Sequence, residues 1–229
     1  MPGQKGRKYL LEHNYRDLLK NINDAAGRSG RSPDSVRLIA VTKTVGVEEV
    51  QRAAGLGITD FGENRVQEAA PKVKQMPELR WHFIGHLQSN KVKDVLPYYS
   101  LIHSLDRPSL LKALQQCAER YNRIVEVLVQ VNTSGEESKF GLAPEKLTRF
   151  LEEVSACNRI RVRGLMTMAP FVDNPEETRP CFNVLRRLRD ENAAAGWELP
   201  ELSMGMTNDY TVAIEEAATM IRIGSALFN

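Results

Sequence analysis

The chain has 229 residues, 42% of them hydrophobic, which is enough for one large domain or two small ones with a full core. Its formal net charge of +2 gives no indication of a nucleic-acid or membrane partner. The three cysteines, odd in number and widely spaced, favour a reducing compartment, and no segment is typical of a signal peptide or a membrane span, so we expect a soluble cytoplasmic protein.

Short apolar segments alternate with helical patterns along the chain. Helical spacing predicts a first helix over residues 9–26, followed by a loop that ends at Pro33. The predicted strands cover residues 36–44, 58–61, 80–85, 101–103, 124–131, 161–166, 202 and 220–223. The predicted helices between them cover residues 47–54, 65–74, 90–96, 107–121, 144–155, 176–195 and 209–218.

This alternation predicts an α/β fold with parallel strands and right-handed crossovers. Eight strand–helix units fit a single (β/α)8 TIM barrel over residues 1–229, with an extra N-terminal helix and loop, about residues 1–34, packed on it. The alternative is an open doubly wound sheet. That fold usually has a glycine-rich fingerprint after its first strand, and Thr42-Lys43-Thr44-Val45 is not one.

The first predicted strand ends in a lysine, Lys43. The strand is expected to be buried on both faces, and the C-terminal ends of barrel strands form the mouth at which ligands bind. A desolvated amine there loses part of its preference for the charged form and can attack a carbonyl to form a Schiff base. The alternative, which this segment alone favours, is a lysine that extends its ammonium group into water.

Other polar residues are expected at the same mouth. The segment after the seventh strand supplies hydroxyls and a glycine, and it leads into the N-terminus of a helix, where free N–H groups favour phosphate. A second polar segment follows the eighth strand, and barrel enzymes often bind phosphate after strands seven and eight. Opposite Lys43, these segments predict a ligand that carries a phosphate. The residues collected at the mouth are Lys43, Asn64, His82, residues 203–207 and residues 222–225.

The remaining candidates give weaker indications. His82 and His86 are the nearest approach to a metal-binding pair, but no third ligand stands near them, so we predict no metal site. Lys139 lies in a polar loop, where solvation is expected, although it could lean over the mouth. The order of residues supports no Ser-His-Asp or Cys-His arrangement, and we assign no catalytic residue.

Several motifs together carry a resemblance to a known family. The longer ones are residues 40–43 (AVTK), 61–68 (FGENRVQE) and 81–91 (WHFIGHLQSNK). The shorter ones are Asn132-Thr133, Gly164-Leu165-Met166, Ser203-Met204-Gly205-Met206 and Arg222-Ile223-Gly224-Ser225. Over residues 38–228 the chain resembles the YggS/PROSC family, the pyridoxal phosphate homeostasis proteins. This resemblance implies a barrel related to the N-terminal domain of alanine racemase.

The resemblance also implies the cofactor and its ligands. It implies pyridoxal 5'-phosphate held as a Schiff base on Lys43, with Asn64 beside the ring and Arg222 facing the pyridine nitrogen. The phosphate would be held by Ser203, Gly205, Thr207, Gly224 and Ser225. Thr207 and Ser225 are hydroxyl-for-hydroxyl variants of the family pattern, and Asn229 replaces its closing glycine. An always-protonated Arg222 would leave the pyridine nitrogen unprotonated and the ring a weak electron sink, which suits a cofactor that is held.

Two functions from different classes follow. We favour a carrier, expected to be a monomer, that buffers pyridoxal phosphate and delivers it to pyridoxal phosphate-dependent apoenzymes without turnover. A racemase needs a second base on the other face of its substrate, which alanine racemases take from another domain, and we expect no such domain here. A Schiff-base aldolase would share the lysine and the phosphate site but would carry no cofactor, so the colour of the protein would distinguish it.

Overall fold

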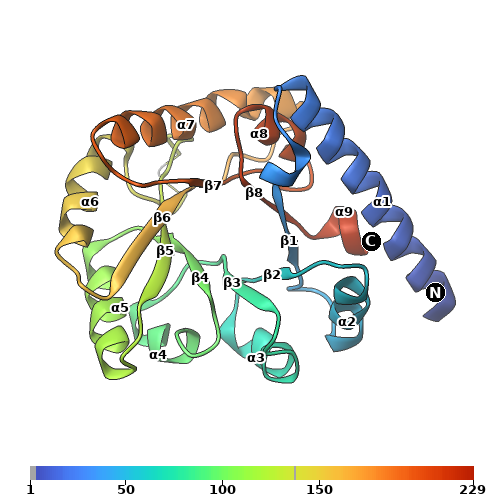
Figure 1. The fold of residues 1–229 in the computed structure, drawn as a ribbon, viewed down its shortest axis with the longest axis horizontal. Coiled ribbons are helices and arrows are strands. Elements are labelled where there is room, and N and C mark those ends of the chain that lie inside the picture. The colour runs from blue at the N-terminus through green and yellow to red at the C-terminus, as the bar shows by residue number, and fades with distance from the viewer. Residues whose placement is uncertain (1–3, 137) are drawn as a thin grey trace.

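Eight parallel strands close into a barrel in the order β1 to β8 in the computed structural model of the chain, which describes residues 4–136 and 138–229 (Figure 1). Each strand is followed by at least one helical segment. This confirms the predicted (β/α)8 TIM barrel with an extra N-terminal helix. The strands are β1 (Arg37–Val41), β2 (Asp60–Glu63), β3 (Arg80–Phe83), β4 (Leu101–Leu105), β5 (Val125–Gln130), β6 (Ile160–Met166), β7 (Glu201–Ser203) and β8 (Met220–Ile223).

The helices form a layer around the outside of the barrel (Figure 1). They are α1 (Gln4–Arg28), α2 (Val47–Gly55), α3 (Val66–Gln75), α4 (Val92–Val95), α5 (Pro108–Arg120), α6 (Leu147–Ser155), α7 (Arg179–Ala194), α8 (Tyr210–Glu215) and α9 (Ser225–Phe228). Short 3-10 segments are η1 (Pro33–Ser35), η2 (Ser89–Lys91), η3 (Pro144–Lys146) and η4 (Pro175–Thr178). No helix among the described residues is long and apolar enough to cross a membrane.

Three predicted helices begin with a 3-10 segment, and one helix was not predicted. The helices expected over residues 144–155 and 176–195 are η3 followed by α6 and η4 followed by α7. The helix expected over residues 90–96 is the 3-10 segment η2 followed by the short helix α4, which ends just before Pro97, a residue that cannot continue the hydrogen-bond ladder. Helix α9 was not predicted. It begins directly after Gly224, whose carbonyl accepts hydrogen bonds from the N–H groups of Leu227 and Phe228.

The apolar core has two parts, because successive side chains of a strand point to opposite faces. Ala40 belongs to the larger part, which is shared by the strands and the surrounding helices, whereas its neighbour Ile39 belongs to a smaller cluster. That cluster joins strands from opposite sides of the barrel, so it lies inside the barrel. Its buried members are Ile39, Leu101, Leu128, Met166 and Met220.

Charged side chains lie at the end of the barrel at which the strands begin, and we call them the basal charge ring. They come from the first or second residue of β1, β2, β3, β5 and β7 and from β6. Opposite charges alternate around this ring, so its members are paired rather than left alone next to the core. The pairs are Arg37 with Asp60 at 3.9 Å and with Glu201 at 3.5 Å, Arg80 with Asp60 at 3.0 Å, and Arg163 with Glu126 at 3.7 Å.

Helix α1 lies along the outside of the barrel beside α8 and α9 (Figure 1). The Asn14 side chain donates to the carbonyl oxygens of Leu227 and Asn229 at 3.2 and 2.9 Å, and the Asn21 side chain donates to the Tyr210 hydroxyl at 3.1 Å. These bonds fix the N-terminal helix to the last two helices of the chain.

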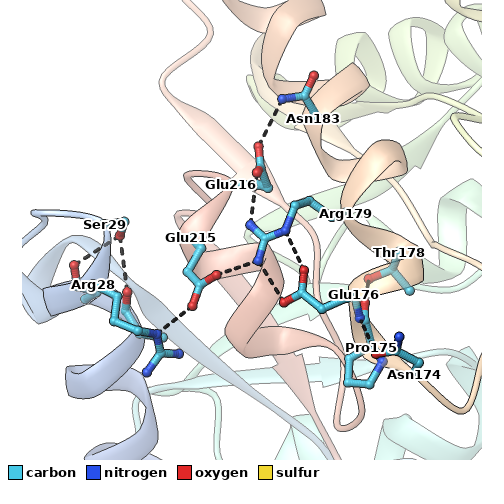
Figure 2. Close-up of polar contacts among 12 residues, drawn as sticks. Arg28, Ser29, Asn174, Pro175, Glu176, Thr178, Arg179, Asn183, Glu215 and Glu216 are labelled. Atoms are coloured by element: carbon cyan, nitrogen blue, oxygen red, sulfur yellow. Dashed lines mark hydrogen bonds and ion pairs between the residues drawn. The ribbon is translucent and has the colours of Figure 1, made fainter.

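An ion-pair network extends this attachment to α7, as Figure 2 shows. Arg28 of α1 pairs with Glu215 at 2.7 Å, and Glu215 also accepts from Arg179 at 2.6 Å. Arg179 binds Glu176 at 2.7 Å and Glu216 at 3.1 Å as well. We call these five residues the Arg179 network. It joins three helices that are far apart in the sequence.

Candidate cofactor site at the barrel mouth

Lys43 lies at the barrel mouth but is not on a buried strand. Strand β1 ends at Val41, and the chain turns at Thr42, whose carbonyl accepts from the Val45 N–H at 3.2 Å. Thr42 is fully buried, whereas Lys43 is exposed. Of the two interpretations of Lys43, the structure shows the one that its own segment favours, a lysine that extends into water, because the turn lifts the side chain out of the sheet.

The turn that carries Lys43 is anchored from below by a buried ion pair. Lys72 of α3 donates to the Thr42 carbonyl at 2.6 Å and to Glu63 Oε1 at 2.6 Å. The Thr42 hydroxyl donates to the same Glu63 oxygen at 2.5 Å. Sequence reasoning missed Glu63 and Lys72. A carboxylate directly after the apolar segment 58–61 was the available signal, since a buried carboxylate needs a partner.

The loop after β7 depends on Gly205. Its φ is +92°, a region that favours glycine, and an added Cβ would lie 2.6 Å from the Cβ of Ala213. The Gly205 carbonyl accepts from the Arg222 N–H at 3.0 Å, and the Met206 N–H donates to Asp209 Oδ1 at 2.6 Å. The loop is thus held against β8 and α8 in one conformation.

Two predicted phosphate ligands come together at the mouth. The hydroxyl oxygens of Thr207 and Ser225 lie 3.1 Å apart, and the Ala226 N–H donates to the Thr207 hydroxyl at 3.3 Å. Next to them, Gly224 is so close to β1 that an added Cβ would lie 3.4 Å from the Val41 carbonyl. Because β1 pairs with β8, these hydroxyls and the Lys43 turn follow neighbouring strand ends.

Arg222 lies just inside the mouth and is only 3% exposed. It donates from Nη1 to the Ser203 hydroxyl at 2.6 Å and from Nη2 to the Thr167 carbonyl at 2.9 Å. Burial lowers the pKa of Arg222 to about 10, against the opposing effect of the Asp209 charge. The guanidinium therefore stays protonated at neutral pH, and its two bonds leave three of its five N–H donors for other partners.

The Ser203 hydroxyl bonds other groups than the Thr207 and Ser225 hydroxyls do. The Ser203 side chain is fully buried, and its hydroxyl bonds both Arg222 and His103 Nδ1, the latter at 2.9 Å. The Thr207 and Ser225 hydroxyls instead bond each other. The structure therefore assigns Ser203 to the surroundings of Arg222, which the sequence prediction did not anticipate.

Asn64 follows β2 and is half-buried. The segment after β3 packs closely on it, since a Cβ on Gly85 would lie 2.3 Å from the Asn64 carbonyl oxygen. Asn64 lines a cavity of about 360 Å³ together with Phe83, His86 and Leu87. Lys43 and Arg222 are not among the residues that line this cavity.

The two histidines considered as a metal pair are used differently. His82 bonds Asp60 and His103 inside the barrel, whereas His86 stacks on Phe140 with ring centroids 3.9 Å apart. Among the described residues, no group of three His, Cys, Asp or Glu side chains is placed to hold a metal. Lys139 is half-buried, and its carbonyl accepts from the Asn132 side chain at 3.3 Å.

Comparison with known proteins identifies the barrel. Residues 13–229 match the family model described as alanine racemase, N-terminal domain, so the fold is that of this class of barrel. A pyridoxal phosphate homeostasis protein from Aquifex aeolicus is 44% identical over 214 residues, which cover 92% of this chain and 94% of that relative. The chain belongs to the family of pyridoxal phosphate homeostasis proteins, which confirms the resemblance carried by its motifs.

Two solved structures resemble the chain over nearly their whole length. An unknown protein from Bifidobacterium adolescentis has a TM-score of 0.91 and 34% identity, with 97% of this chain and 96% of that chain covered. PipY from Synechococcus elongatus, solved with pyridoxal phosphate bound, has a TM-score of 0.80 and 36% identity. That match covers 91% of this chain and 100% of PipY.

Proposed function

We propose that this chain binds pyridoxal phosphate at its barrel mouth and holds it for delivery to other proteins, with no turnover of its own. The observation that carries the proposal is that the candidate residues lie at the ends of two paired strands, β1 and β8. The Lys43 turn follows β1, and Arg222, Gly224 and Ser225 lie on or directly after β8. The relatives named for pyridoxal phosphate homeostasis and the PipY structure with the cofactor bound support it.

The residues present fit this cofactor. A phosphate dianion needs donors, and the Thr207 and Ser225 hydroxyls supply them beside the backbone of Gly205 and Gly224. Arg222 has only donors, which suits the lone pair of a pyridine nitrogen. In this proposal Ser203 supports Arg222, and Asn64 lies beside the ring.

Lys43 is proposed as the covalent anchor. The cofactor supplies an aldehyde, which condenses with the ε-amine of Lys43 to a C=N bond with loss of water. The exposed position of Lys43 leaves this amine reachable from solution. The buried bonds from Lys72 and Glu63 hold the backbone of the turn while the side chain stays free to react.

Arg222 favours holding over catalysis. A protonated guanidinium beside the pyridine nitrogen keeps that nitrogen unprotonated, so the ring accepts electrons weakly. We propose that the chain acts as a monomer in the cytoplasm and that pyridoxal phosphate-dependent apoenzymes receive the cofactor. The free thiols Cys117, Cys157 and Cys181 are consistent with a reducing compartment.

Transfer to an apoenzyme tests the proposal. The chain is saturated with pyridoxal phosphate, freed of excess cofactor by gel filtration and mixed with a pyridoxal phosphate-dependent apoenzyme. We expect the apoenzyme to regain activity and the visible absorbance of the carrier to fall in parallel. Lys43→Ala is the test variant, and Lys112→Ala, on the exposed face of α5, is the matched control. A chain that binds no cofactor, or that never releases it, would contradict the proposal.

A racemase is the second candidate, favoured by the match to the alanine racemase N-terminal domain. Racemisation needs a proton removed on one face of the α-carbon and returned on the other, and each positioned proton transfer contributes about 10²–10⁴-fold. Deuterium incorporation at the α-carbon of alanine, compared with loss of optical rotation, measures it. We expect no turnover above free pyridoxal phosphate, and rapid racemisation that requires Lys43 would replace the carrier with the racemase.

A further inference from the structure

Five buried polar side chains inside the barrel form one continuous hydrogen-bonded series, which we call the core relay. The bonds join Arg222 Nη1 to Ser203 Oγ at 2.6 Å, Ser203 Oγ to His103 Nδ1 at 2.9 Å, His103 Nε2 to His82 Nδ1 at 3.0 Å and His82 Nε2 to Asp60 Oδ1 at 2.9 Å. Each of the five is at most 3% exposed.

The core relay runs from one end of the barrel to the other. Asp60 is the first residue of β2 and belongs to the basal charge ring, whereas Ser203 is the last residue of β7 and Arg222 lies near the end of β8. At the basal end, Asp60 Oδ2 also accepts from the Thr59 hydroxyl at 2.6 Å and from Arg80 at 3.0 Å. These two donors fix the carboxylate.

The chemistry of the five groups allows one proton order when Asp60 is ionised and both imidazoles are neutral. The carboxylate only accepts, so His82 Nε2 carries a proton and His82 Nδ1 accepts. His103 then donates from Nε2 and accepts at Nδ1 from the Ser203 hydroxyl. The Ser203 oxygen in turn accepts from Arg222. Every bond thus donates in one direction, from the guanidinium to the carboxylate.

The surroundings favour two of the charge states that this order requires, an ionised Asp60 and a neutral His103. Burial alone would raise the pKa of Asp60, but hydrogen bonds from His82 and Thr59 and the charge of Arg80 lower it overall. Burial is the main cause that holds the pKa of His103 well below its usual value. In this proton order, neutral groups join a cation at one end to an anion at the other.

Burying such a series of polar groups costs free energy, so its presence inside the barrel needs an explanation. The inside of a TIM barrel is usually filled by bulky apolar side chains, as it is here around Ile39 and Leu128. Replacing buried charged groups by apolar ones of similar size is often neutral or stabilising. Fold stability alone therefore does not account for the four linked polar groups beneath Arg222.

We propose that Ser203, His103, His82 and Asp60 are positioning residues for Arg222, and that their single proton order holds its guanidinium in place to bind the pyridine nitrogen of the cofactor. The inference rests on the proposed function for its last part. The proton order and the fixed guanidinium are properties of the chain itself and are measurable without cofactor.

Asp60→Asn tests the proton order most sharply. Because Thr59 and Arg80 both donate at the Oδ2 position, the amide must place its oxygen there and turn its NH2 group toward His82. His82 then accepts at Nε2, and both imidazoles change from the Nε2–H to the Nδ1–H tautomer. The matched control is Glu201→Gln, an acid-to-amide change in the same basal charge ring. Glu201, like Asp60, pairs with Arg37, but it has no bond to His82.

The first measurement is the 15N spectrum of the histidine side chains in the full-length chain at pH 7. We expect Nε2–H tautomers for His82 and His103 in the wild type and in Glu201→Gln, and Nδ1–H tautomers in Asp60→Asn. The side-chain signals of Arg222 should show restricted rotation in the wild type and faster rotation in Asp60→Asn. A wild-type Nδ1–H tautomer or doubly protonated ring in either histidine, or an equally mobile Arg222 in all three proteins, would overturn the proposal.

The second measurement is the Kd for pyridoxal phosphate by equilibrium dialysis. We expect Asp60→Asn to raise Kd about tenfold, the size of coupling typical within one hydrogen-bond network, and Glu201→Gln to change it less than about twofold. Equal effects of the two variants would overturn the positioning role. A wild type that binds no cofactor but keeps the expected tautomers and fixed guanidinium would refute the proposed function and support the ordered relay.

A second variant pair keeps the test decisive if Asp60→Asn does not fold. Ser203→Ala removes the member of the core relay that bonds Arg222 directly. Ser104→Ala makes the same change in the fully buried serine that follows His103 in the chain, and the Ser104 hydroxyl has no hydrogen-bond partner among the described residues. We expect Ser203→Ala to free the Arg222 side chain and raise Kd about tenfold, with no change in Ser104→Ala. Equal behaviour of the two serine variants would overturn the proposal.

Discussion

Two networks in this molecule each contain an arginine, and they use it in opposite ways. In the Arg179 network on the outside of the barrel, the guanidinium touches three carboxylates directly, and the Arg179 side chain is 33% exposed (Figure 2). In the core relay, Arg222 is 3% exposed and stands at one end, and three side chains separate it from Asp60. Water solvates the first network, and the protein alone solvates the second.

The difference shows what each network does for the chain. Hydrogen bonds to Glu176, Glu215 and Glu216 raise the pKa of Arg179 further above its usual value, but exposed pairs of this kind contribute little to stability and weaken in salt. They align helices. A buried network also contributes little net stability, yet removing one of its members leaves an unpaired buried group. The core relay therefore fixes the position of Arg222 far more strictly than the Arg179 network fixes Arg179.

The largest expected effect comes from a third cation, Lys72, which is buried. Lys72→Met leaves Glu63, which is fully buried, without its ammonium partner. We expect a loss of about 3–5 kcal/mol in the free energy of unfolding, measured with urea. Lys93→Met, on the exposed side of α4, is the control and should change it by less than about 0.5 kcal/mol. A loss in Lys72→Met as small as in the control would show that the buried pair is not intact in solution.

Arg222→Ala compared with Arg179→Ala separates the two arginines by function. Loss of a charged donor beside the cofactor ring should weaken pyridoxal phosphate binding by about 1.5–3 kcal/mol, or roughly 10- to 150-fold in Kd, and change the visible spectrum. Arg179→Ala should leave both unchanged. Equilibrium dialysis and absorbance measure the effect. Unchanged affinity together with an unchanged spectrum in Arg222→Ala would rule out contact with the ring.

Asp60→Asn should change how stability depends on pH. The folded pKa of Asp60 is lowered, so the carboxylate stabilises the fold above its unfolded pKa, about 3.9, and that contribution is lost as pH falls through the folded pKa. We expect the variant to lose about 1–2 kcal/mol at pH 7, with the difference from wild type shrinking below about pH 4. Urea unfolding from pH 3 to pH 7 measures it. A difference that stayed constant across this range would contradict the sign of the shift.

Glu215→Gln should have the smallest effect. Burial alone would raise the pKa of Glu215, but hydrogen bonds from Arg179 and Arg28 lower it. These pairs are partly solvated, so we expect a loss of about 0.2–1 kcal/mol at low ionic strength that largely disappears in 1 M NaCl. The Asp60→Asn loss should persist in the same salt. If salt abolished both losses, the distinction between the two networks would fail.

Much of the fold followed from the sequence because its pattern is local. Each strand is a short apolar run, and eight such runs between helical patterns leave few topologies, so the closed barrel was predictable. The position of Lys43 after the first strand was predictable for the same reason. The contact that anchors the turn at Thr42 was not predictable, because it comes from Lys72, which lies 30 positions away in the chain.

The core relay could not be predicted because its bonds join residues that are distant in the sequence. His103 and Ser203 are 100 positions apart, and Arg222 binds Ser203 from a different strand. The sequence held only a weak signal, namely a polar side chain inside each of three apolar strands, at Asp60, His82 and His103. A polar side chain in one strand does not show which partner it faces, and only the closure of the barrel brings these three together.

The most direct test of the account is borohydride reduction of the chain loaded with pyridoxal phosphate, followed by proteolysis and mass mapping. Reduction converts a C=N bond into a stable secondary amine and so marks the lysine that formed it. We predict the label on Lys43, and no label at this position when Lys43→Ala is treated in the same way. A label on Lys72, Lys139 or any other lysine of the wild-type chain, or no label at all, would contradict the assignment of Lys43 as the anchor at the barrel mouth.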